Sequence, residues 1–413
     1  MRILYLTQWF DPEPNVIKGP RFVRALEAAG HEVAVVTGFP NYPTGRLYPG
    51  YRLRFLERET IEGARVTRLP LYPSHDGSSL RRSLNYLSFF VSTLVFGLLR
   101  KRSFELAYVY HPPITVGLAA ALSGLVRGLP FVLEVQDLWP DTVAATGMGG
   151  ARLTRLLGLV CRFVYRRASA IIVQSDGMRR TLIARGVPAA KLATIRNWAG
   201  QEPASAPPAD AGRQDGFSVV YAGNHGRSQS LETVLDAAAI IERRRQDIRF
   251  HVYGDGIETQ RLRRRAESMG LTTLRFHGRV PDEEILSAFA GAGALLLHLA
   301  EGPLFEITIP SKTQTYLAMG RPIVAGVAGE TAELLRQSGA AMVVAPENPP
   351  ALAHAICAMA DLPREKRGAM GAAGARFYRE TLSFDKAMER TLGVLEGVRR
   401  RPAGAPVLAG RPC

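Results

Sequence analysis

The chain has 413 residues, of which 46% are hydrophobic and 22% are charged, a composition typical of a globular protein rather than a disordered one. At this length at least two domains are expected. The three cysteines, Cys161, Cys357 and Cys413, are too few and too scattered for a disulfide framework or a zinc cluster, so a reducing cytosolic compartment is expected. The first residues, MRILYLTQWF, are expected to form a buried strand rather than a signal peptide.

The net charge is +15, from 52 lysines and arginines against 37 acidic residues. This surplus favours an anionic partner such as nucleic acid, anionic lipid or a phosphorylated substrate, unless it reflects only a GC-rich genome. A nucleic-acid-binding protein would interleave aromatic and basic residues on an exposed face. Because the basic residues here flank aliphatic runs instead, we expect no nucleic-acid partner, although that class is kept as an alternative.

Short apolar strands alternate with helical patterns along the first half of the chain, which predicts a parallel sheet covered on both faces. A linker rich in Ala, Pro and polar residues follows at 199–214, and the alternation then restarts. The predicted fold class is α/β, with two doubly wound Rossmann-like domains at residues 1–198 and 215–382. Ligands of such sheets bind at the carboxyl ends of the strands, so a cleft between the two sheets is the expected active site. Residues 400–413 are expected to form a flexible tail.

Two stretches combine apolar and basic residues in a way that is typical of a membrane interface. Residues 87–99 carry no charge and are shorter than the ~20 residues that span a bilayer. Residues 151–168 place leucines on one helical stripe and arginines elsewhere. Such helices suit an anionic membrane surface, although the apolar stripe of 151–168 could equally face the domain core. The basic residues that flank the first stretch are Arg81, Arg82, Arg100, Lys101 and Arg102.

Three glycine-bearing turns close predicted strands of the second half. Gly223-Asn224-His225-Gly226-Arg227 would present free backbone N–H groups at a helix entrance, an arrangement that binds anions, and Arg227 could add a guanidinium to a phosphate. Gly254 lies in the next turn, and Val280 ends the third strand, where exposed backbone could pair with a nucleobase. Each motif taken alone is equally compatible with an ordinary tight turn.

The segment FEITIPSKTQTYLAMGRPIVAG at 305–326 gives a sharper prediction. The start of a predicted helix carries four polar side chains, those of Ser311, Lys312, Thr313 and Thr315, and Lys312 supplies an ammonium group. Together with the 223–227 turn they would clamp a diphosphate from two sides. Neither turn has an acidic cluster suited to a divalent metal, so no metal cofactor is expected, and Lys312, Arg227 and the helix ends would neutralise the charge. The alternative is a capped helix with a solvated lysine.

Two loops of the first half carry further candidates. EVQDLWPD at 134–141 ends a strand, and Asp137 there is the candidate for positioning the acceptor or the sugar, unless it only caps a helix. The loop at 10–21 places Lys18 and Gly19 at the next helix entrance.

These motifs, in this order, resemble glycosyltransferase family 4, whose members are retaining enzymes with the two-domain GT-B fold. The likeness extends from residue 1 to about 398. It is most specific for bacterial surface-polysaccharide transferases of the fucosamine and colanic-acid type. It rests on GHEVAVVTGFPNYP, YPSHDGSSLRRSLNYLSF, EVQDLWPD, NHGRSQSLETVLDAA, VYGDG, FHGRV and IPSKTQTYLAMGRPIVAG.

The resemblance implies transfer of a sugar from a nucleotide-sugar donor, expected to be UDP-linked, to a lipid-linked saccharide. The first domain would bind this acceptor and the second would bind the nucleotide. The implied enzyme works at the inner face of the cell membrane, with an anionic membrane surface as a partner. A helix at about 383–398 would cross back to the first domain. The positions implied at the donor are Gly19, Gly223, Asn224, Arg227, Val280, Ser311 and Lys312.

This sequence departs from the family pattern at the sugar and ribose contacts. The family carries two glutamates, the second of which bonds the donor ribose, and here Thr315 takes the second position. Glu306 is the nearest match to the first, one residue out of register. Gln136 stands before Asp137, where many members have a histidine. A deoxy or amino sugar donor is therefore expected. A GT-B-type epimerase and a scaffold without catalysis are the alternatives.

Overall fold

The computed structural model of the chain describes residues 1–14, 17–74, 78–100, 104–145, 150–200 and 216–400. Most of the predicted linker and all but the first residue of the predicted tail lie outside these residues. Contacts divide the chain into one unit of Met1–Arg196 with Ala387–Cys413 and a second unit of Asn197–Lys386. The division falls within helix α15, Phe384–Arg399, so the chain returns to the first unit after completing the second.

The first unit is built on an eight-stranded sheet with the order β3-β4-β2-β1-β5-β6-β7-β8. All neighbours are parallel except β3 and β4, which form a hairpin. The inner strands are continuous apolar runs because helices cover both faces of the sheet. The strands are β1 Arg2–Leu6, β2 Glu32–Gly38, β3 Glu57–Ile61, β4 Ala64–Leu69, β5 Leu106–His111, β6 Phe131–Val135, β7 Ala170–Val173 and β8 Leu192–Thr194.

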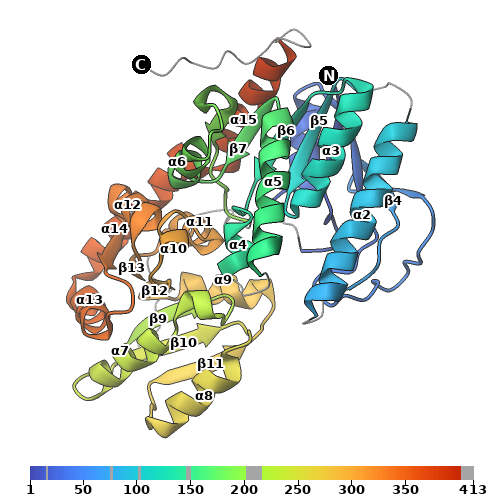
Figure 1. Cartoon of the computed structure of the whole chain (residues 1–413). Coiled ribbons are helices and arrows are strands. Elements are labelled where there is room, and N and C mark those ends of the chain that lie inside the picture. The colour runs from blue at the N-terminus through green and yellow to red at the C-terminus, as the bar shows by residue number, and fades with distance from the viewer. Residues whose placement is uncertain (15–16, 75–77, 101–103, 146–149, 201–215, 401–413) are drawn as a thin grey trace. The chain divides into compact units, whose positions relative to one another are not determined.

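Right-handed crossovers place α1 on one face of this sheet and α2, α3 and α5 on the other. Helix α3 lies between α2 and α5, and both pack against it (Figure 1). The strand order reverses between β1 and β5, which makes the loops after these two strands the expected ligand-binding edge. The helices are α1 Pro20–Ala28, α2 Ser79–Leu99, α3 Ile114–Arg127, α4 Asp141–Ala145, α5 Ala151–Arg167 and α6 Asp176–Ala184.

Helix α2 is longer than the sequence prediction. The expectation that the apolar segment is too short to span a bilayer was wrong, because the helix that contains it already begins at Ser79 and has 21 residues. The Ser78 hydroxyl caps its start by accepting from the Arg81 N–H. Among the described helices, α2 alone is long and apolar enough to cross a membrane by length and composition. One side of it is nevertheless part of the first unit, since Asn85, Phe89 and Thr93 are buried there.

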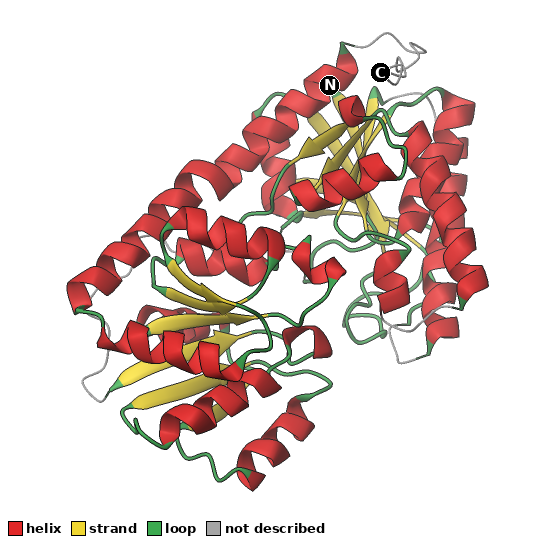
Figure 2. Ribbon diagram, turned by 60° about the vertical axis from the view of Figure 1, so that its left-hand side comes forward, coloured by secondary structure: helices red, strands yellow, loops and turns green. Residues whose placement is uncertain are grey.

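The second unit has a six-stranded parallel sheet in the order β11-β10-β9-β12-β13-β14 with helices on both faces (Figure 2). Alternate residues of its strands enter two separate apolar clusters. Val219 and Leu296 pack on one face, and Val220 and Leu295 pack on the other. The order reverses between β9 and β12, so the loop after β9 is the expected ligand site. The strands are β9 Phe217–Ala222, β10 Ile248–Tyr253, β11 Leu274–Gly278, β12 Ala294–His298, β13 Ile323–Gly326 and β14 Ala341–Val344.

The helices of the second unit follow its strands closely. A single 3-10 turn at Arg227–Gln229 lies between β9 and α7. The helices are α7 Glu232–Glu242, α8 Thr259–Ser268, α9 Asp282–Ala290, α10 Pro303–Glu306, α11 Ser311–Ala318, α12 Gly329–Ser338, α13 Pro349–Asp361 and α14 Arg364–Phe377.

Candidate active site

The carboxyl ends of the paired strands β9 and β10 lie side by side in the second unit, and each strand is followed directly by a glycine. Gly223 has φ 147° and Gly254 has φ 109°, conformations that residues with a side chain rarely adopt. A Cβ on Gly254 would lie 1.9 Å from the carbonyl oxygen of Gly223. A Cβ on Gly223 would lie 2.8 Å from Nζ of Lys312. The structure therefore brings together the first glycine turn and Lys312, two features that the sequence analysis assigned to one diphosphate clamp.

Lys312 lies in the first turn of α11 against Tyr221. Its Nζ donates to the Tyr221 hydroxyl at 2.6 Å and lies 4.1 Å from the centroid of the same ring. The Tyr221 hydroxyl in turn donates to the carbonyl oxygen of Asn224 at 2.8 Å. Burial lowers the pKa of Lys312 to about 7, and no carboxylate of the described residues forms an ion pair with it. The ammonium is thus poorly neutralised in the absence of a ligand, which is what an anion-binding lysine requires.

The start of α11 supplies further donors. Pro310 precedes the helix without any side-chain cap, so the N–H groups of Ser311 and Lys312 have no intrahelical partner. Thr315 is on the same side of the helix, and its hydroxyl donates to the Ser311 carbonyl at 3.3 Å. Thr313 is different: it is fully buried, so the prediction that it contacts the donor was wrong, because its position on α11 faces the core.

Arg227 and His225 lie in the turn that follows β9. The Arg227 side chain is 86% exposed, and its Nε lies 3.3 Å from Oε1 of Glu258. His225 is buried, with its ring nitrogens 3.0 Å from Oγ1 of Thr259 and 3.3 Å from the Tyr253 carbonyl oxygen. Burial lowers the pKa of His225, so this ring is a neutral structural link. The role of Arg227 at a phosphate stays a prediction, since its observed partner is Glu258.

Two other predicted donor contacts lie in the second unit. Val280 follows β11 and is partly buried against the apolar cluster of α9 and α11. Glu306 is exposed at the end of α10. Gly329, the first residue of α12, has φ 59°, and a Cβ on it would lie 2.0 Å from the Glu306 carbonyl oxygen. The missing side chain therefore lets the end of α10 pack closely against the start of α12.

In the first unit, a buried ion pair holds the loop that follows β1. Nζ of Lys18 lies 3.0 Å from Oε2 of Glu134, and both side chains are at most 2% exposed. Glu134 also accepts from Nε2 of Gln136 at 2.6 Å and from the Tyr108 hydroxyl. Burial lowers the pKa of Lys18, and the charge of Glu134 opposes this shift. The prediction that Lys18 contacts the acceptor or the membrane was wrong, because this pair buries it and leaves Gly19 at the start of α1.

The sequence analysis missed Glu134, although a signal was present. Glu134 interrupts the otherwise apolar strand FVLEV, and a carboxylate buried in such a strand requires a cationic partner. The pair ties the loop before α1 to the carboxyl ends of β5 and β6 and so positions Gly19 and Asp137.

Asp137 lies in the loop after β6, as predicted, among aromatic side chains. Burial raises its pKa, and no side-chain hydrogen bond or ion pair to it is found within the described ranges. The Trp139 ring centroid lies 5.9 Å from that of His111 and 6.3 Å from that of Tyr86. Burial raises the pKa of Tyr86, the charge of Arg82 opposes this shift, and Tyr42 and Asp137 add to it.

Helix α2 carries the predicted basic flanks. Arg81 and Arg82 lie in its first turn, and Arg100 follows its last residue, whereas Lys101 and Arg102 lie outside the described residues. The Arg100 guanidinium stacks on Phe96 and Phe104, with its carbon 5.0 and 4.1 Å from the two ring centroids. Burial and the charge of Arg58 lower the pKa of Arg100.

The described residues contain no group of three or more His, Cys, Asp or Glu side chains that could hold a metal ion. The structure places Lys312 and backbone N–H groups at the turn after β9.

Comparison with known proteins gives the family. The profile of the glycosyl transferase 4-like domain matches residues 20–198, and that of glycosyl transferases group 1 matches residues 216–361. A putative colanic acid biosynthesis glycosyl transferase of Escherichia coli, WcaI, is 29% identical over 81% of this chain and 85% of its own length. A probable glycosyltransferase of Pseudomonas aeruginosa, WbjE, is 26% identical over 57% of this chain and 61% of its own length.

Solved structures agree on the fold. HepE of Anabaena, determined with UDP and glucose, matches with a TM-score of 0.68 and 15% identity over 96% of this chain and 99% of its own. Sucrose-phosphate synthase of Thermosynechococcus elongatus matches with a TM-score of 0.68 and 16% identity over 96% and 99%. At these identities the likeness shows the GT-B fold alone. The two profiles, the two relatives and this fold together make the chain a glycosyltransferase of the family 4 type.

Proposed function

We propose that this glycosyltransferase moves a sugar from a UDP-linked donor to a lipid-linked saccharide, with retention of anomeric configuration and without a metal. The donor sugar is a deoxy or amino sugar, and the product enters a cell-surface polysaccharide. The likeness to a putative colanic acid biosynthesis transferase supports the pathway, and the UDP bound by HepE supports the donor nucleotide. The enzyme acts at the cytoplasmic face of the membrane.

The observation that carries this proposal is the position of Lys312 beside Gly223. Negative charge develops on the donor diphosphate as the glycosidic bond breaks, and a buried ammonium with free N–H groups of α11 stabilises it. These groups are fixed before the reaction, so they need no reorganisation when the charge develops. Thr315 contributes one hydroxyl to the ribose where relatives contribute a carboxylate.

Retention follows if the acceptor hydroxyl attacks from the side on which the nucleotide leaves. The leaving phosphate then accepts the proton of the acceptor hydroxyl, and no side-chain nucleophile is needed. Asp137 has the raised pKa of a buried carboxyl group, and in this scheme it positions the acceptor by a hydrogen bond rather than attacking the donor.

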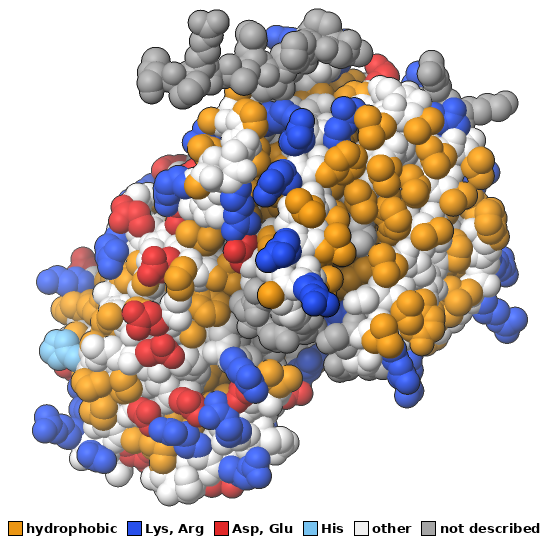
Figure 3. Space-filling view, viewed as in Figure 1, with side chains coloured by type: hydrophobic (Ala, Val, Ile, Leu, Met, Phe, Trp, Pro, Cys, Tyr) orange, Lys and Arg blue, Asp and Glu red, His pale blue; other side chains and the backbone are white. Residues whose placement is uncertain are grey.

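Membrane association rests on the outer side of α2. Its exposed residues recur every three or four positions, which forms one apolar stripe with arginines at both ends. Hydrophobic side chains gather over α2 in Figure 3. The other side of the helix is buried in the first unit, which favours a helix lying in the interface over one that spans it. The stripe is Leu80, Leu84, Leu87, Val91, Val95 and Leu99.

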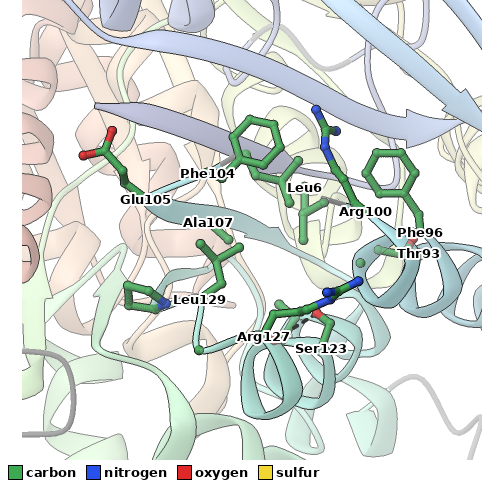
Figure 4. Close-up of a pocket in the computed structure, with 15 residues that line it drawn as sticks. Leu6, Thr93, Phe96, Arg100, Phe104, Glu105, Ala107, Ser123, Arg127 and Leu129 are labelled. Atoms are coloured by element: carbon green, nitrogen blue, oxygen red, sulfur yellow. Dashed lines mark hydrogen bonds between the residues drawn. The ribbon is translucent and has the colours of Figure 1, made fainter. Parts of the chain in front are cut away.

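The carboxyl end of the stripe borders a cavity of about 300 Å³ between α2 and α3. Arg100 and Arg127 project toward it beside Phe96, Phe104 and Leu129 (Figure 4). Arginines beside apolar walls suit the headgroup region of an anionic lipid, which supports the same orientation of α2 toward the membrane.

The proposal is tested by incubating the full chain with a panel of UDP-sugars and an undecyl-diphosphate-linked saccharide, with and without EDTA. Transfer that resists EDTA and gives a product with the anomeric configuration of the donor, read by NMR, supports it. Inversion of configuration would refute the retaining mechanism, and loss of transfer in EDTA would refute metal independence.

A further inference from the structure

A groove of about 860 Å³ lies in the first unit between α2 and the β3–β4 hairpin. Residues that lie directly opposite each other on two antiparallel strands have their side chains on the same face. Two such pairs of the hairpin line this groove, Arg58 with Thr67 and Thr60 with Arg65. The hairpin therefore gives the groove, which we call the α2 groove, a polar and basic wall.

Helix α2 gives the groove an apolar wall. Val91, Val95 and Leu99 follow each other at intervals of four residues, so they lie along one side of the helix, and all three line the groove. Val91 is 54% exposed and Leu99 is 75% exposed. The same three residues belong to the apolar stripe that we propose meets the membrane. A hydrocarbon chain can therefore pass from a bilayer into the α2 groove along a continuous apolar surface.

Most charged side chains that line the groove already form ion pairs. These pairs are Glu32 with Arg65 at 3.0 Å, Glu59 with Arg68 at 2.6 Å, and Arg2 with Glu105 at 3.9 Å. Arg58 and Arg100 also line the groove, and neither forms an ion pair within the part of the chain that the structure describes. The groove therefore carries positive charge that no carboxylate of these residues neutralises.

Arg58 and Arg100 are close enough to repel each other, since the charge of Arg58 contributes to the lowered pKa of Arg100. The Arg100 guanidinium stacks on Phe96 and Phe104, and Figure 4 shows it beside these rings. This stacking holds the guanidinium in place before any ligand binds. An anion bound by both arginines would relieve their repulsion and accept charge-assisted hydrogen bonds from them.

The Arg100 end of the groove lies at the edge of the sheet opposite the loops that form the candidate active site. Helix α2 connects β4 to β5, which run in the same direction, so it runs from the carboxyl edge of the sheet to the amino edge. Near its start, Asn85 accepts from Gln8 at 2.6 Å and donates to Asn41 at 3.2 Å, in the loops after β1 and β2. Arg100 follows its last residue, and Phe104 precedes β5. A ligand at Arg100 is therefore a different molecule from one that reacts at the carboxyl edge.

We infer that the α2 groove binds one anionic phospholipid of the membrane. Its phosphate lies between Arg58 and Arg100, and an acyl chain lies along Val91, Val95 and Leu99. The inference rests on the proposed association of α2 with the membrane. It goes further because it assigns a site to a single lipid that is not a substrate. Such a site would hold the end of α2 to the bilayer more specifically than an apolar stripe alone.

The same two segments of the chain supply a matched control for the arginines. The variant R58Q/R100Q loses two charges from the groove. The variant R52Q/R81Q loses two charges from the segment before β3 and from the first turn of α2, and neither Arg52 nor Arg81 lines the groove. The two variants have the same net charge and differ in whether the lost groups reach the groove.

The experiment measures binding of dihexanoyl phosphatidylglycerol to the full chain by isothermal titration calorimetry, below the concentration at which this lipid forms micelles. We expect R58Q/R100Q to bind at least about tenfold more weakly than the wild type, because two charge-assisted hydrogen bonds are lost. R52Q/R81Q should bind within about twofold of the wild type. If R58Q/R100Q does not fold, Arg58→Gln changes only the exposed arginine and should still weaken binding by at least about threefold.

A second pair of variants tests the acyl chain. Val95→Trp places a large side chain in the groove and should weaken binding by at least about fivefold, because the chain loses its apolar contacts. Leu84→Trp adds the same side chain to the α2 stripe outside the groove and should leave affinity within about twofold. Inorganic phosphate, which has no acyl chain, should bind at least about tenfold more weakly than the lipid.

Three results would overturn the inference. Equal losses in R58Q/R100Q and R52Q/R81Q would show general electrostatic attraction instead of a site. Unchanged affinity in Val95→Trp would exclude the acyl chain from the groove, and phosphate that binds as tightly as the lipid would identify a site for free phosphate. The measurement needs neither donor nor acceptor, and the transfer assay described above needs no phosphatidylglycerol. Failure of this inference is therefore distinguishable from failure of the proposed function.

Discussion

Lys312 makes donor binding depend on pH in a way that can be worked out from the structure. Burial lowers its pKa from 10.5 to about 7 in the ligand-free chain. A diphosphate beside Nζ favours the charged ammonium and raises this pKa in the complex. Binding above about pH 7 therefore takes up a proton, and affinity falls as the pH rises between the free and the bound pKa.

The size of the effect follows from the fraction of free protein that carries the charged lysine. With a pKa of about 7, this fraction falls from about 0.8 at about pH 6.5 to about 0.03 at about pH 8.5. Affinity should fall about 25-fold over this range, which is about 1.9 kcal/mol. Burial lowers the pKa of both His225 and His277, so their titration shifts toward lower pH than that of Lys312.

The assay is isothermal titration calorimetry with a UDP-sugar, whose diphosphate diester does not titrate in this range. Each titration is run in two buffers of different ionisation enthalpy, which counts the protons taken up. Lys312→Arg is the control, since its guanidinium stays charged and should give a flat profile. The reasoning is refuted if wild-type affinity is independent of pH, or if Lys312→Arg keeps the wild-type slope.

Three further predictions concern other parts of the chain. Glu134→Gln leaves the buried Lys18 without its counterion. It should therefore lower the free energy of unfolding, measured by denaturant titration, by about 3–5 kcal/mol. Adding Lys18→Met to the same chain should recover most of this loss. Leu87→Ser with Val91→Ser should release the protein from anionic vesicles in a flotation assay, and full retention would exclude the α2 stripe from membrane binding. Thr315→Val should weaken binding of a UDP-sugar by about 2–10-fold, and the same loss with a dideoxyribose analogue would rule out the ribose contact.

The alternation of strands and helices allowed much of the second unit to be predicted, including the glycine turn and Lys312. The glycine turn follows β9 directly, and Lys312 lies on α11 in the segment between β12 and β13, so both belong to connections that leave the carboxyl ends of parallel strands at one edge of the sheet. The contact between Nζ of Lys312 and Gly223 could not be predicted, because it depends on the register of β9 and on the direction of one side chain. Thr313 illustrates the same limit, since neighbouring residues of a helix point about 100° apart and Thr313 is the one that is buried.

The first unit was harder to predict because its contacts are between distant segments. A lysine in a loop is exposed in most proteins, and only the burial of Glu134 on β6 explains why Lys18 is not. The hairpin of β3 and β4 was missed, although Glu62 and Gly63, both with positive φ, form its two-residue turn. Glu-Gly is a weaker turn signal than the Asn-Gly or Asp-Gly pairs that the sequence rules favour.

The charges at the turn after β9 explain how one site can bind a diphosphate tightly and still release it. In the ligand-free chain Lys312 is close to half-protonated near neutral pH, and Arg227 is held by Glu258. The free turn therefore carries only part of the positive charge that Lys312 and Arg227 could supply. Under the proposed function, donor binding would draw a proton to Lys312, so that the ammonium would be fully charged when the leaving group forms. After transfer, departure of the nucleotide returns the proton to solvent, and burial again disfavours the charged lysine. Under the proposed function, the ammonium of Lys312 would stabilise the leaving group, and the burial that lowers its pKa would weaken the hold on the nucleotide as the pH rises above about 7.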